Sequence, residues 1–294
     1  MPSMKNIKRR LASVASTKKI MKAMNMVAAS KLQKDKARLE ATCPFFSAAL
    51  RIIEPLRSIN DSDSPFLTQR KVKNSAYLII AADRGLCGSY NTNLANAAIE
   101  HMEGKNEKIL MIGQRGYELF KRKGKNILRK YDDVINTVFF EEAQLIAADL
   151  VQMYSKGEAD EVYIVYTDFV TAITYVPRIS TLLPITEQME NPLETKCKPE
   201  PYVPTPPSVV TASMKYEPNL PEYLEQAVPF FLSATVYTAL LEASTCEQAA
   251  RMVSMDTSST NADEITTTLT RTYNRIRQNA ITQEISEVVG ASQD

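Results

Sequence analysis

The sequence predicts a mixed α/β protein, with long helices at its two ends paired as an antiparallel coiled coil and a small parallel sheet between them. From Glu222 to Val289 the chain has one proline, Pro229, and no glycine. A helix of that length runs roughly 100 Å at about 1.5 Å per residue. Residues 3–55 also lack glycine and have one internal proline, Pro44. We therefore expect coiled-coil helices at 1–58 and 220–290 and an α/β domain at 72–218.

The first helix is predicted from its apolar period. A narrow stripe recurs at intervals of three, four and once seven residues, formed by Ile7, Leu11, Val14, Met21, Met24, either Val27 or Ala28, and Leu32. Lysines and arginines cover the other faces. Pro44 should kink or interrupt this helix, and Pro55 is a candidate stop.

The middle of the chain alternates strand and helix patterns, which indicates a parallel sheet. After a polar linker at 56–74, the continuous apolar run at 76–82 is typical of a strand buried on both faces. We expect further strands at 108–113 and 161–166, helices at 91–103, 116–123 and 141–155, and an alternating edge strand at 172–184.

A proline-rich stretch leads to the last helix. Eight of the fifteen prolines lie between Thr186 and Pro221, which predicts an extended, partly flexible connection with one short strand near 214–216. The helix then begins near Pro221, because proline is favoured in a first turn, and Pro229 should bend it early.

Net charge is near zero, but the two ends differ. Residues 1–40 hold eleven Lys or Arg and two acids, whereas residues 242–294 hold four arginines and eight acids. Opposite charges favour pairing of the two helices. The basic helix is then either a solvated face of the coiled coil or a surface for an acidic protein partner. Nucleic acid fits less well, because residues 1–40 contain no aromatic side chain and the apolar stripe calls for a partner helix.

Membrane and redox signals are weak. No uninterrupted apolar run reaches the roughly eighteen residues that cross a bilayer, and the basic N-terminus is not followed by an apolar block as in a secretory signal. Four cysteines, Cys43, Cys87, Cys197 and Cys246, lie far apart without a CxxC motif. We expect buried thiols in a reducing compartment, with neither a disulfide framework nor a zinc site.

Two places invite a chemical interpretation. The Gly85-x-x-Gly88 loop follows the first strand, but it lacks GxGxxG and GxxxxGK[ST] spacing, so a tight strand-to-helix turn is favoured over a nucleotide site. Gly113 and Gly116 form a weaker case. His101, the single histidine, is expected on solvated surface. No catalytic constellation can be assembled, and no cofactor or metal is expected.

The late helix has a seam of small and hydroxyl side chains: Ser258, Ser259, Thr260, Thr266, Thr267 and Thr268. An apolar end follows, made of Ile276, Ala280, Ile281, Ile285, Val288 and Val289. This pattern fits a plain coiled-coil seam. It also fits a thin shaft whose end sits inside the sleeve of a partner.

Three blocks of sequence make a resemblance specific. Residues 18–32 resemble the N-terminal signature of the F-type ATP synthase gamma subunit, and residues 247–255, 261–262 and 273–285 resemble its C-terminal signature. Asp83, Arg84, Gly85 and Gly88, in the stretch 83–88, are similar to the family's central loop. The blocks keep the family's order and spacing over nearly the whole chain.

This resemblance implies a rotor. In that family the terminal helices form a shaft inside a hexamer of alpha and beta subunits, and a Rossmann-like central domain binds no nucleotide. With the epsilon subunit, that domain forms the foot of the shaft on the membrane ring of c subunits. The shaft transmits torque between the ion-driven c-ring and the catalytic beta subunits, and it catalyses nothing itself.

The resemblance also implies residue roles. Lys19, Lys22 and Met24 match the part that faces the acidic lever segments of the beta subunits. Polar positions that reach a beta-subunit loop are matched by Arg277, Gln278, Thr282 and Glu284. The bearing end of the shaft is matched by Ile285, Val288 and Val289.

Some points depart from the family or stay open. The regulatory insertion of chloroplast relatives is absent and Cys87 and Cys197 look isolated, so thiol switching is not expected. The proline-rich stretch 192–207 has no assigned role. We expect a peripheral protein on the cytoplasmic face of a bacterial plasma membrane, held through the c-ring, with the mitochondrial matrix side as the alternative. The coupling ion, proton or sodium, stays open.

Two other functions remain as alternatives. One is a coiled-coil adaptor or nucleic-acid-binding protein, which predicts salt-sensitive binding to nucleic acid. The other is an enzyme with a degenerate nucleotide fold, which predicts saturable dinucleotide binding.

Overall fold

The computed structural model describes residues 4–58, 64–186 and 219–291, together with Met189, Leu193, Cys197 and Tyr216. The chain forms two compact units. We call Met1–Ser30 with Arg251–Asp294 the helical unit and Lys31–Ala250 the sheet unit. The long helices α1 (Met4–Ile53) and α7 (Leu220–Ala291) contribute residues to both units. The three domains expected from the sequence divide the chain differently, and that division stays a prediction.

The sheet unit is built on a five-stranded sheet in the order β3-β2-β1-β4-β5. The strands are β1 (Ser75–Ile80), β2 (Glu107–Ile112), β3 (Ile127–Tyr131), β4 (Glu161–Phe169) and β5 (Tyr175–Leu183). β1 pairs in parallel with β2 and β4, and β5 runs antiparallel to β4 at one edge. The predicted buried first strand and the predicted edge strand are thus confirmed. The sequence missed β3, because this short edge strand carries exposed Leu128 and Arg129 instead of a buried apolar run.

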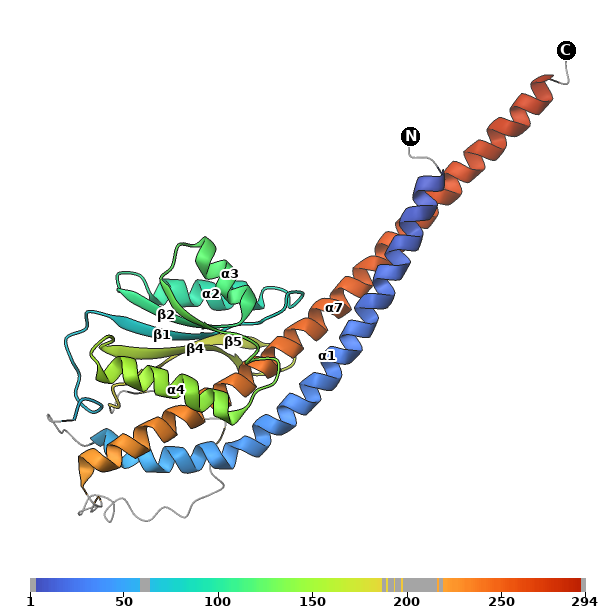
Figure 1. Cartoon of the computed structure of the whole chain (residues 1–294). Helices are drawn as coiled ribbons and strands as arrows, with labels where there is room; N and C mark the ends of the chain where they lie inside the picture. Colours follow the sequence, from blue (N-terminus) through green and yellow to red (C-terminus); the bar gives the residue numbers. More distant parts are fainter. Residues whose placement is uncertain are drawn as a thin grey trace. The chain divides into compact units, whose positions relative to one another are not determined.

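Helices cover both faces of this sheet. Figure 1 shows α2 (Tyr90–His101) and α3 (Gln114–Arg122) on one face and α4 (Phe140–Ser155) on the other. Successive side chains of β1 point to opposite faces of the sheet, and Tyr77 and Ile79 pack with residues of α2 and α3 on one face. Leu78 and Ile80 belong to the larger cluster, which includes α4 and parts of α1 and α7. All six residues of β1 are therefore buried, as its continuous apolar run predicts.

The helical unit is an antiparallel pair. Asn25 Nδ2 donates a hydrogen bond of 2.8 Å to the Met252 carbonyl oxygen, and Lys18 forms an ion pair with Asp263. An earlier residue of α1 thus pairs with a later residue of α7, so the two helices run in opposite directions. Figure 1 shows that α7 continues past the first turns of α1. The sequence left Val27 and Ala28 open as seam residues; Ala28 is 1% exposed and Val27 is 58% exposed, so Ala28 lies in the seam.

The ends of the long helices depart slightly from expectation. α1 continues through Pro44 to Ile53 without interruption, so Pro44 does not break it, and Pro55 lies in the following 3-10 helix η1 (Glu54–Ser58). α7 begins at Leu220 beside the predicted Pro221. Asn219 caps it: its Oδ1 accepts from the backbone N–H of Glu222 at 2.9 Å, and its Nδ2 donates to the Glu222 carboxylate at 2.8 Å.

The cysteine prediction is partly wrong. Cys87 and Cys246 are buried thiols outside any disulfide, as expected, but Cys43 and Cys197 form a disulfide across a sequence separation of 154 residues. Nothing in their spacing signals this pair, because only the fold brings α1 beside the segment that follows β5. Of the short strand expected near 214–216, only Tyr216 lies among the described residues.

One described helix is long and apolar enough to cross a membrane by length and composition, namely α7 over Leu220–Gln283. The apolar window that passes this test is 83% buried within the structure. Such burial is typical of the core helix of a protein, and residues of α7 from Leu224 to Ala243 do belong to the larger core cluster.

Candidate partner-binding surface

The predicted contact residues of α1 lie on an open helix surface. Lys19 and Lys22 are exposed, and Met24 is half-buried in the helical unit. Large apolar side chains stand among these lysines: Ile20 is 58% exposed and Met26 is 62% exposed. A surface that mixes exposed apolar groups with positive charge suits a partner that is both apolar and acidic.

The predicted contact residues of α7 are exposed as well. Arg277, Gln278 and Thr282 all face solvent within the helical unit. The Thr282 hydroxyl donates to the Gln278 carbonyl oxygen at 3.0 Å, so its side chain is held against its own helix. The side chain of Glu284 lies outside the described part of the structure.

The predicted bearing end is a helix end with open apolar groups. Ile285 is 59% exposed and Val288 is 70% exposed. The side chain of Val289 lies outside the described part. Exposed branched apolar groups at the end of a helix are the kind of surface that a partner would cover.

The loop at 83–88 is a structural joint. The Asp83 carboxylate accepts from the backbone N–H of Gln114 at 3.0 Å and from Asn136 Nδ2 at 2.8 Å, so it caps the N-terminus of α3. Gly88 has a φ of +59°, which a residue without Cβ adopts most easily. Arg84 and Gly85 lie in the same turn, and a Cβ on Gly85 would meet only the Arg115 side chain, at 3.6 Å.

This loop also joins the sheet to α7. Cys87 and Tyr90 pack in one buried cluster with Cys246 and Ala250 of α7. The Tyr90 hydroxyl donates to the Ala243 carbonyl oxygen at 3.3 Å. In open α/β sheets, ligands bind outside the carboxyl ends of the strands. Here the chain's own helix packs against the loop after β1, which supports the tight-turn interpretation of this loop over a nucleotide site.

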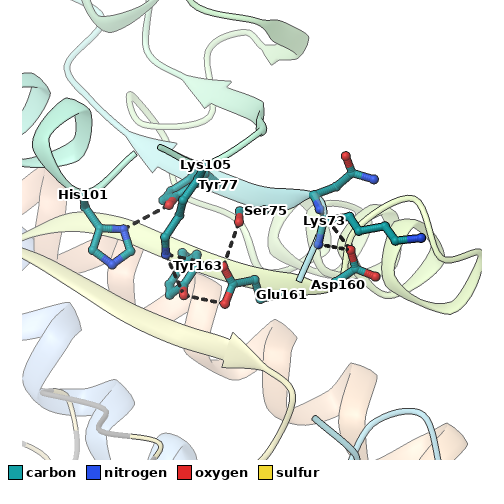
Figure 2. A network of polar contacts seen from close by, with 9 residues as sticks. Lys73, Ser75, Tyr77, His101, Lys105, Asp160, Glu161 and Tyr163 are labelled. Carbon is teal, nitrogen blue, oxygen red and sulfur yellow. Dashed lines mark hydrogen bonds and ion pairs between the residues drawn. The ribbon is translucent and has the colours of Figure 1, made fainter. Parts of the chain in front are cut away.

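A polar network that the sequence did not reveal lies where β1 and β4 begin (Figure 2). Glu161 is at its centre: its carboxylate accepts from Ser75 Oγ and from the Tyr163 hydroxyl, both at 2.7 Å, and from Lys105 Nζ at 3.4 Å. Burial by itself raises the pKa of Glu161, but these hydrogen bonds and the Lys105 charge outweigh it and lower the pKa. The adjacent Asp160 accepts from the backbone N–H groups of Lys73 and Asn74, at 2.8 and 2.9 Å.

His101 belongs to this network, so its assignment to solvated surface is wrong. Its Nδ1 lies 3.0 Å from the Tyr77 hydroxyl, and its ring meets the Tyr163 ring edge-on. Burial, with Lys105 nearby, lowers the pKa of His101. The pKa of Tyr77 and that of Tyr163 are raised, chiefly by burial. The network thus fixes the first residues of two neighbouring strands. Its members come from separate segments, and this is why spacing along the chain gave no signal.

No group of three or more His, Cys, Asp or Glu side chains that could hold a metal occurs within 4–58, 64–186 or 219–291.

Comparisons with known proteins agree over the whole chain. A family model described as ATP synthase matches residues 3–293. The ATP synthase gamma chain of Desulforamulus reducens is 39% identical, with 99% of each chain covered. That of Alkaliphilus metalliredigens is 36% identical over 99% of this chain and 98% of its own. The sodium-ion-specific gamma chain of Acetobacterium woodii is 37% identical, with the same coverage.

Solved structures show the same fold. The central stalk and c-ring structure of the Tetrahymena thermophila mitochondrial ATP synthase contains a chain with a TM-score of 0.58 and 25% identity, covering 81% of this chain and 98% of that one. A chain in the rotor of the Euglena gracilis mitochondrial ATP synthase has a TM-score of 0.66 and 20% identity, covering 95% and 98%.

Proposed function

The chain belongs to the ATP synthase gamma chain family, and from this premise we propose how its two units share the work of a central rotor. The helical unit is the shaft that turns inside a hexamer of alpha and beta subunits. The sheet unit is the foot, which meets the c-ring with the epsilon subunit. The observation that carries this proposal is the match to gamma chains along the full length, joined to a helical unit whose charged and apolar side chains are open.

A rotor has to transmit torque along its length, and we assign this role to α7 because of how it packs in the sheet unit. Between Phe231 and Ala250 this helix is buried almost continuously in the sheet unit. Glu242 accepts from the backbone N–H of Phe169 at 3.2 Å, at the end of β4, and Tyr90 bonds to the α7 backbone. A close-packed interior transmits strain because it has few voids to absorb it. A force on the sheet would therefore act on α7 directly.

The contact with the beta subunits is assigned to the open faces of both helices. Lys19, Lys22 and Met24 of α1 contact an acidic segment of a beta subunit, where complementary charge sets register and association rate. On α7, the polar contacts with beta are made by Arg277, Gln278, Thr282 and Glu284. The end formed by Ile285, Val288 and Val289 turns in an apolar bearing. On α7, Ser258, Ser259 and Thr266 are half-buried, so small or hydroxyl groups at these positions keep the shaft narrow, whereas Thr260, Thr267 and Thr268 are exposed.

Attachment to the membrane is indirect in this proposal. The chain is a peripheral part of a membrane-bound ATP synthase and reaches the bilayer only through the c-ring. We place it on the cytoplasmic face of a bacterial plasma membrane, with the mitochondrial matrix side as the alternative. Support comes from the bacterial gamma chains that match it over nearly their whole length.

The test reconstitutes the chain with the alpha and beta subunits of its own source and measures ATP hydrolysis. The double variant Lys19→Glu with Lys22→Glu places two carboxylates against the acidic segment of a beta subunit. Like charges that meet at an interface weaken binding by several kcal/mol. We expect a stoichiometric complex with several-fold lower activity and an unchanged unfolding temperature of the free chain, because both lysines are exposed.

The matched control reverses two exposed lysines of the sheet unit, Lys71→Glu with Lys123→Glu, and so makes the same change in net charge. This variant should hydrolyse ATP like the wild type. Equal losses in the two variants would mean that the lysines act through net charge alone, and the assigned contact would be wrong. Failure of the wild-type chain to enter any complex would end the rotor proposal.

A further inference from the structure

The disulfide between Cys43 and Cys197 ties α1 to the segment that follows the last strand. The two Cα atoms are 4.7 Å apart, although 154 residues separate them in the sequence. Both residues lie in the sheet unit, so the bond is formed within one compact unit. It therefore closes a covalent ring that includes the end of α1, from Cys43 to Ile53, and the whole sheet.

Described residues around Cys197 show how this segment docks. Met189, Leu193 and Cys197 recur every four residues, and each is at most 4% exposed. The Cys197 backbone N–H donates to the Leu193 carbonyl oxygen at 3.0 Å, as in one helical turn. Ser47 Oγ of α1, one turn beyond Cys43, donates to the Cys197 carbonyl oxygen at 2.6 Å. We call Met189, Leu193 and Cys197 the docked turn.

A small cavity lies beside this bond. It has a volume of about 160 Å³ and is lined by both cysteines, Leu39, Leu193, Phe169 and Glu242, among others. The two sulfurs differ in access, because Cys43 is half-buried whereas Cys197 is 2% exposed. An attacking thiolate needs access to one sulfur of the pair. The cavity and the partial exposure of Cys43 give that access on the α1 side.

We propose that the Cys43–Cys197 pair is a redox-sensitive clamp, opened by a dithiol reductant that attacks at Cys43. The reductant thiolate bonds to Cys43 Sγ, the disulfide bond breaks, and Cys197 leaves as a thiolate that takes up a proton. The second thiol of the reductant then displaces Cys43, which is released as a thiol. Two electrons and two protons pass to the protein, and the reductant becomes a disulfide.

Opening the clamp acts on the part of α7 that is anchored in the sheet unit. Glu242 lines the cavity and bonds to the end of β4. In the next turn, the Cys246 thiol donates to the Thr167 carbonyl oxygen at 3.2 Å. With the bond reduced, the covalent link to α1 is lost, while the buried side chains of Met189 and Leu193 and the hydrogen bond from Ser47 still hold the docked turn. Water then reaches the cavity more often, and the contact between α7 and β4 loosens.

The first test counts thiols in the full chain, taken from its own cells with acid quenching. Labelling in denaturant should modify two cysteines before dithiothreitol and all four after it. The Cys43→Ala with Cys197→Ala variant should give two under both conditions. The matched variant Cys87→Ala, which removes a buried cysteine outside the disulfide, should give one labelled cysteine before dithiothreitol and three after it. Four labelled thiols in the untreated wild type would overturn the proposal.

The second test asks whether the bond controls the joint. Reduction of the wild type should lower its unfolding temperature by roughly 5–10 °C, as expected for loss of a bond that closes a long loop. Amide hydrogen exchange should rise several-fold at Cys197 and along α1 near Ser47. The double alanine variant should be insensitive to the reductant. If reduction changes neither exchange nor unfolding temperature, the bond is not a clamp.

The last arm rests on the proposed rotor function. In a complex with alpha and beta subunits, reduction should change ATP hydrolysis at least two-fold for the wild type and leave the double alanine variant unchanged. Equal activity of the oxidised and reduced wild type would overturn the regulatory role even with a confirmed disulfide. Failure of the complex to form would count against the rotor function alone, because thiol counts and hydrogen exchange are read on the free chain.

Discussion

Two parts of one helix, α7, have opposite surroundings. From Phe231 to Ala250 every residue is buried except Tyr237, which is half-buried. From Asp256 to Val288, Ala262 is the single buried residue among the described side chains. The backbone is the same helix throughout, and hydroxyl side chains bond back to carbonyl oxygens in both parts. The difference therefore arises from packing and not from helix formation.

This contrast shows how a helix can be both anchor and exposed surface. In the sheet unit, α7 gains its stability from apolar contacts on all sides, which fix it in one position. In the helical unit a narrow seam holds the pair together, and the remaining surface stays open. We expect substitutions in the buried part to change stability and those in the open part to change partner contacts.

The largest effect should come from a matched pair of valines. Val236 is fully buried in the larger core cluster, and Val288 is 70% exposed. Val236→Ala removes two buried carbons and leaves a cavity, so it should lower the free energy of unfolding by about 2–3 kcal/mol. Val288→Ala should change it by less than about 0.5 kcal/mol. Urea unfolding of the full chain measures both, and similar losses would break the contrast.

Two threonines with the same hydrogen bond sharpen the comparison. Thr238 and Thr267 each donate to the carbonyl oxygen four residues earlier, at 2.8 and 2.9 Å. Thr238 is fully buried, so Thr238→Ala should cost about 1–2 kcal/mol through lost packing. Thr267 is exposed, and alanine there should stabilise by a few tenths of a kcal/mol because it forms helix more readily. A loss at Thr267 as large as that at Thr238 would show that the back-bond itself matters.

The first turn of α7 should depend on its cap. Asn219→Ala leaves the Glu222 N–H without its side-chain acceptor and should lower the free energy of unfolding by about 1 kcal/mol. Asn219→Gly should cost only a few tenths, since glycine is tolerated at this position. Chemical denaturation of the two variants gives the difference. If both variants lost the same free energy of unfolding, the loss would not come from the capping hydrogen bond.

The smallest effect concerns pH and the polar network. The pKa of His101 is lowered from 6.5 by burial, with Lys105 adding to it, so the unfolded chain binds more protons near that pH. Its contribution to stability is present above about pH 6.5 and is lost as the pH falls below that value. Because His101 is only half-buried, the loss should stay below about 1 kcal/mol.

His101→Gln tests this directly. The variant should flatten the dependence of unfolding free energy on pH between 7.5 and 5.5. Protonation of Glu161, whose lowered pKa places its loss of stability below about pH 4.5, falls outside that range. An unchanged slope would show that another group titrates there.

Much of the fold followed from local patterns. The run at 76–82 and the alternating edge strand were found because buried and half-buried strands leave clear periods in the sequence. β3 left none, since it is short and partly exposed at the sheet edge. Pro44 was expected to disturb α1, yet the helix continues through it, and residues on both sides of the proline pack in the larger core cluster, Leu39 before it and Phe46 after it.

The candidate site divides in the same way. Exposure of Lys19, Lys22, Arg277 and Gln278 was predictable, because polar positions opposite a narrow apolar stripe face outward.

The packing of Tyr90 against Cys246 could not be predicted from the sequence, since these two residues are more than 150 positions apart. The same holds for the placement of His101 beside Tyr77 and Tyr163.

By itself, the sequence determined the long terminal helices, the parallel sheet between them and the family, because these depend on periods and motifs within short stretches. Only the tertiary structure decided that Ala28 and not Val27 enters the seam and that Cys43 meets Cys197. It also decided that the loop at 83–88 closes on α7. The physical reason is that a local pattern fixes which face a residue takes, whereas its partner on that face is chosen by close packing between distant segments.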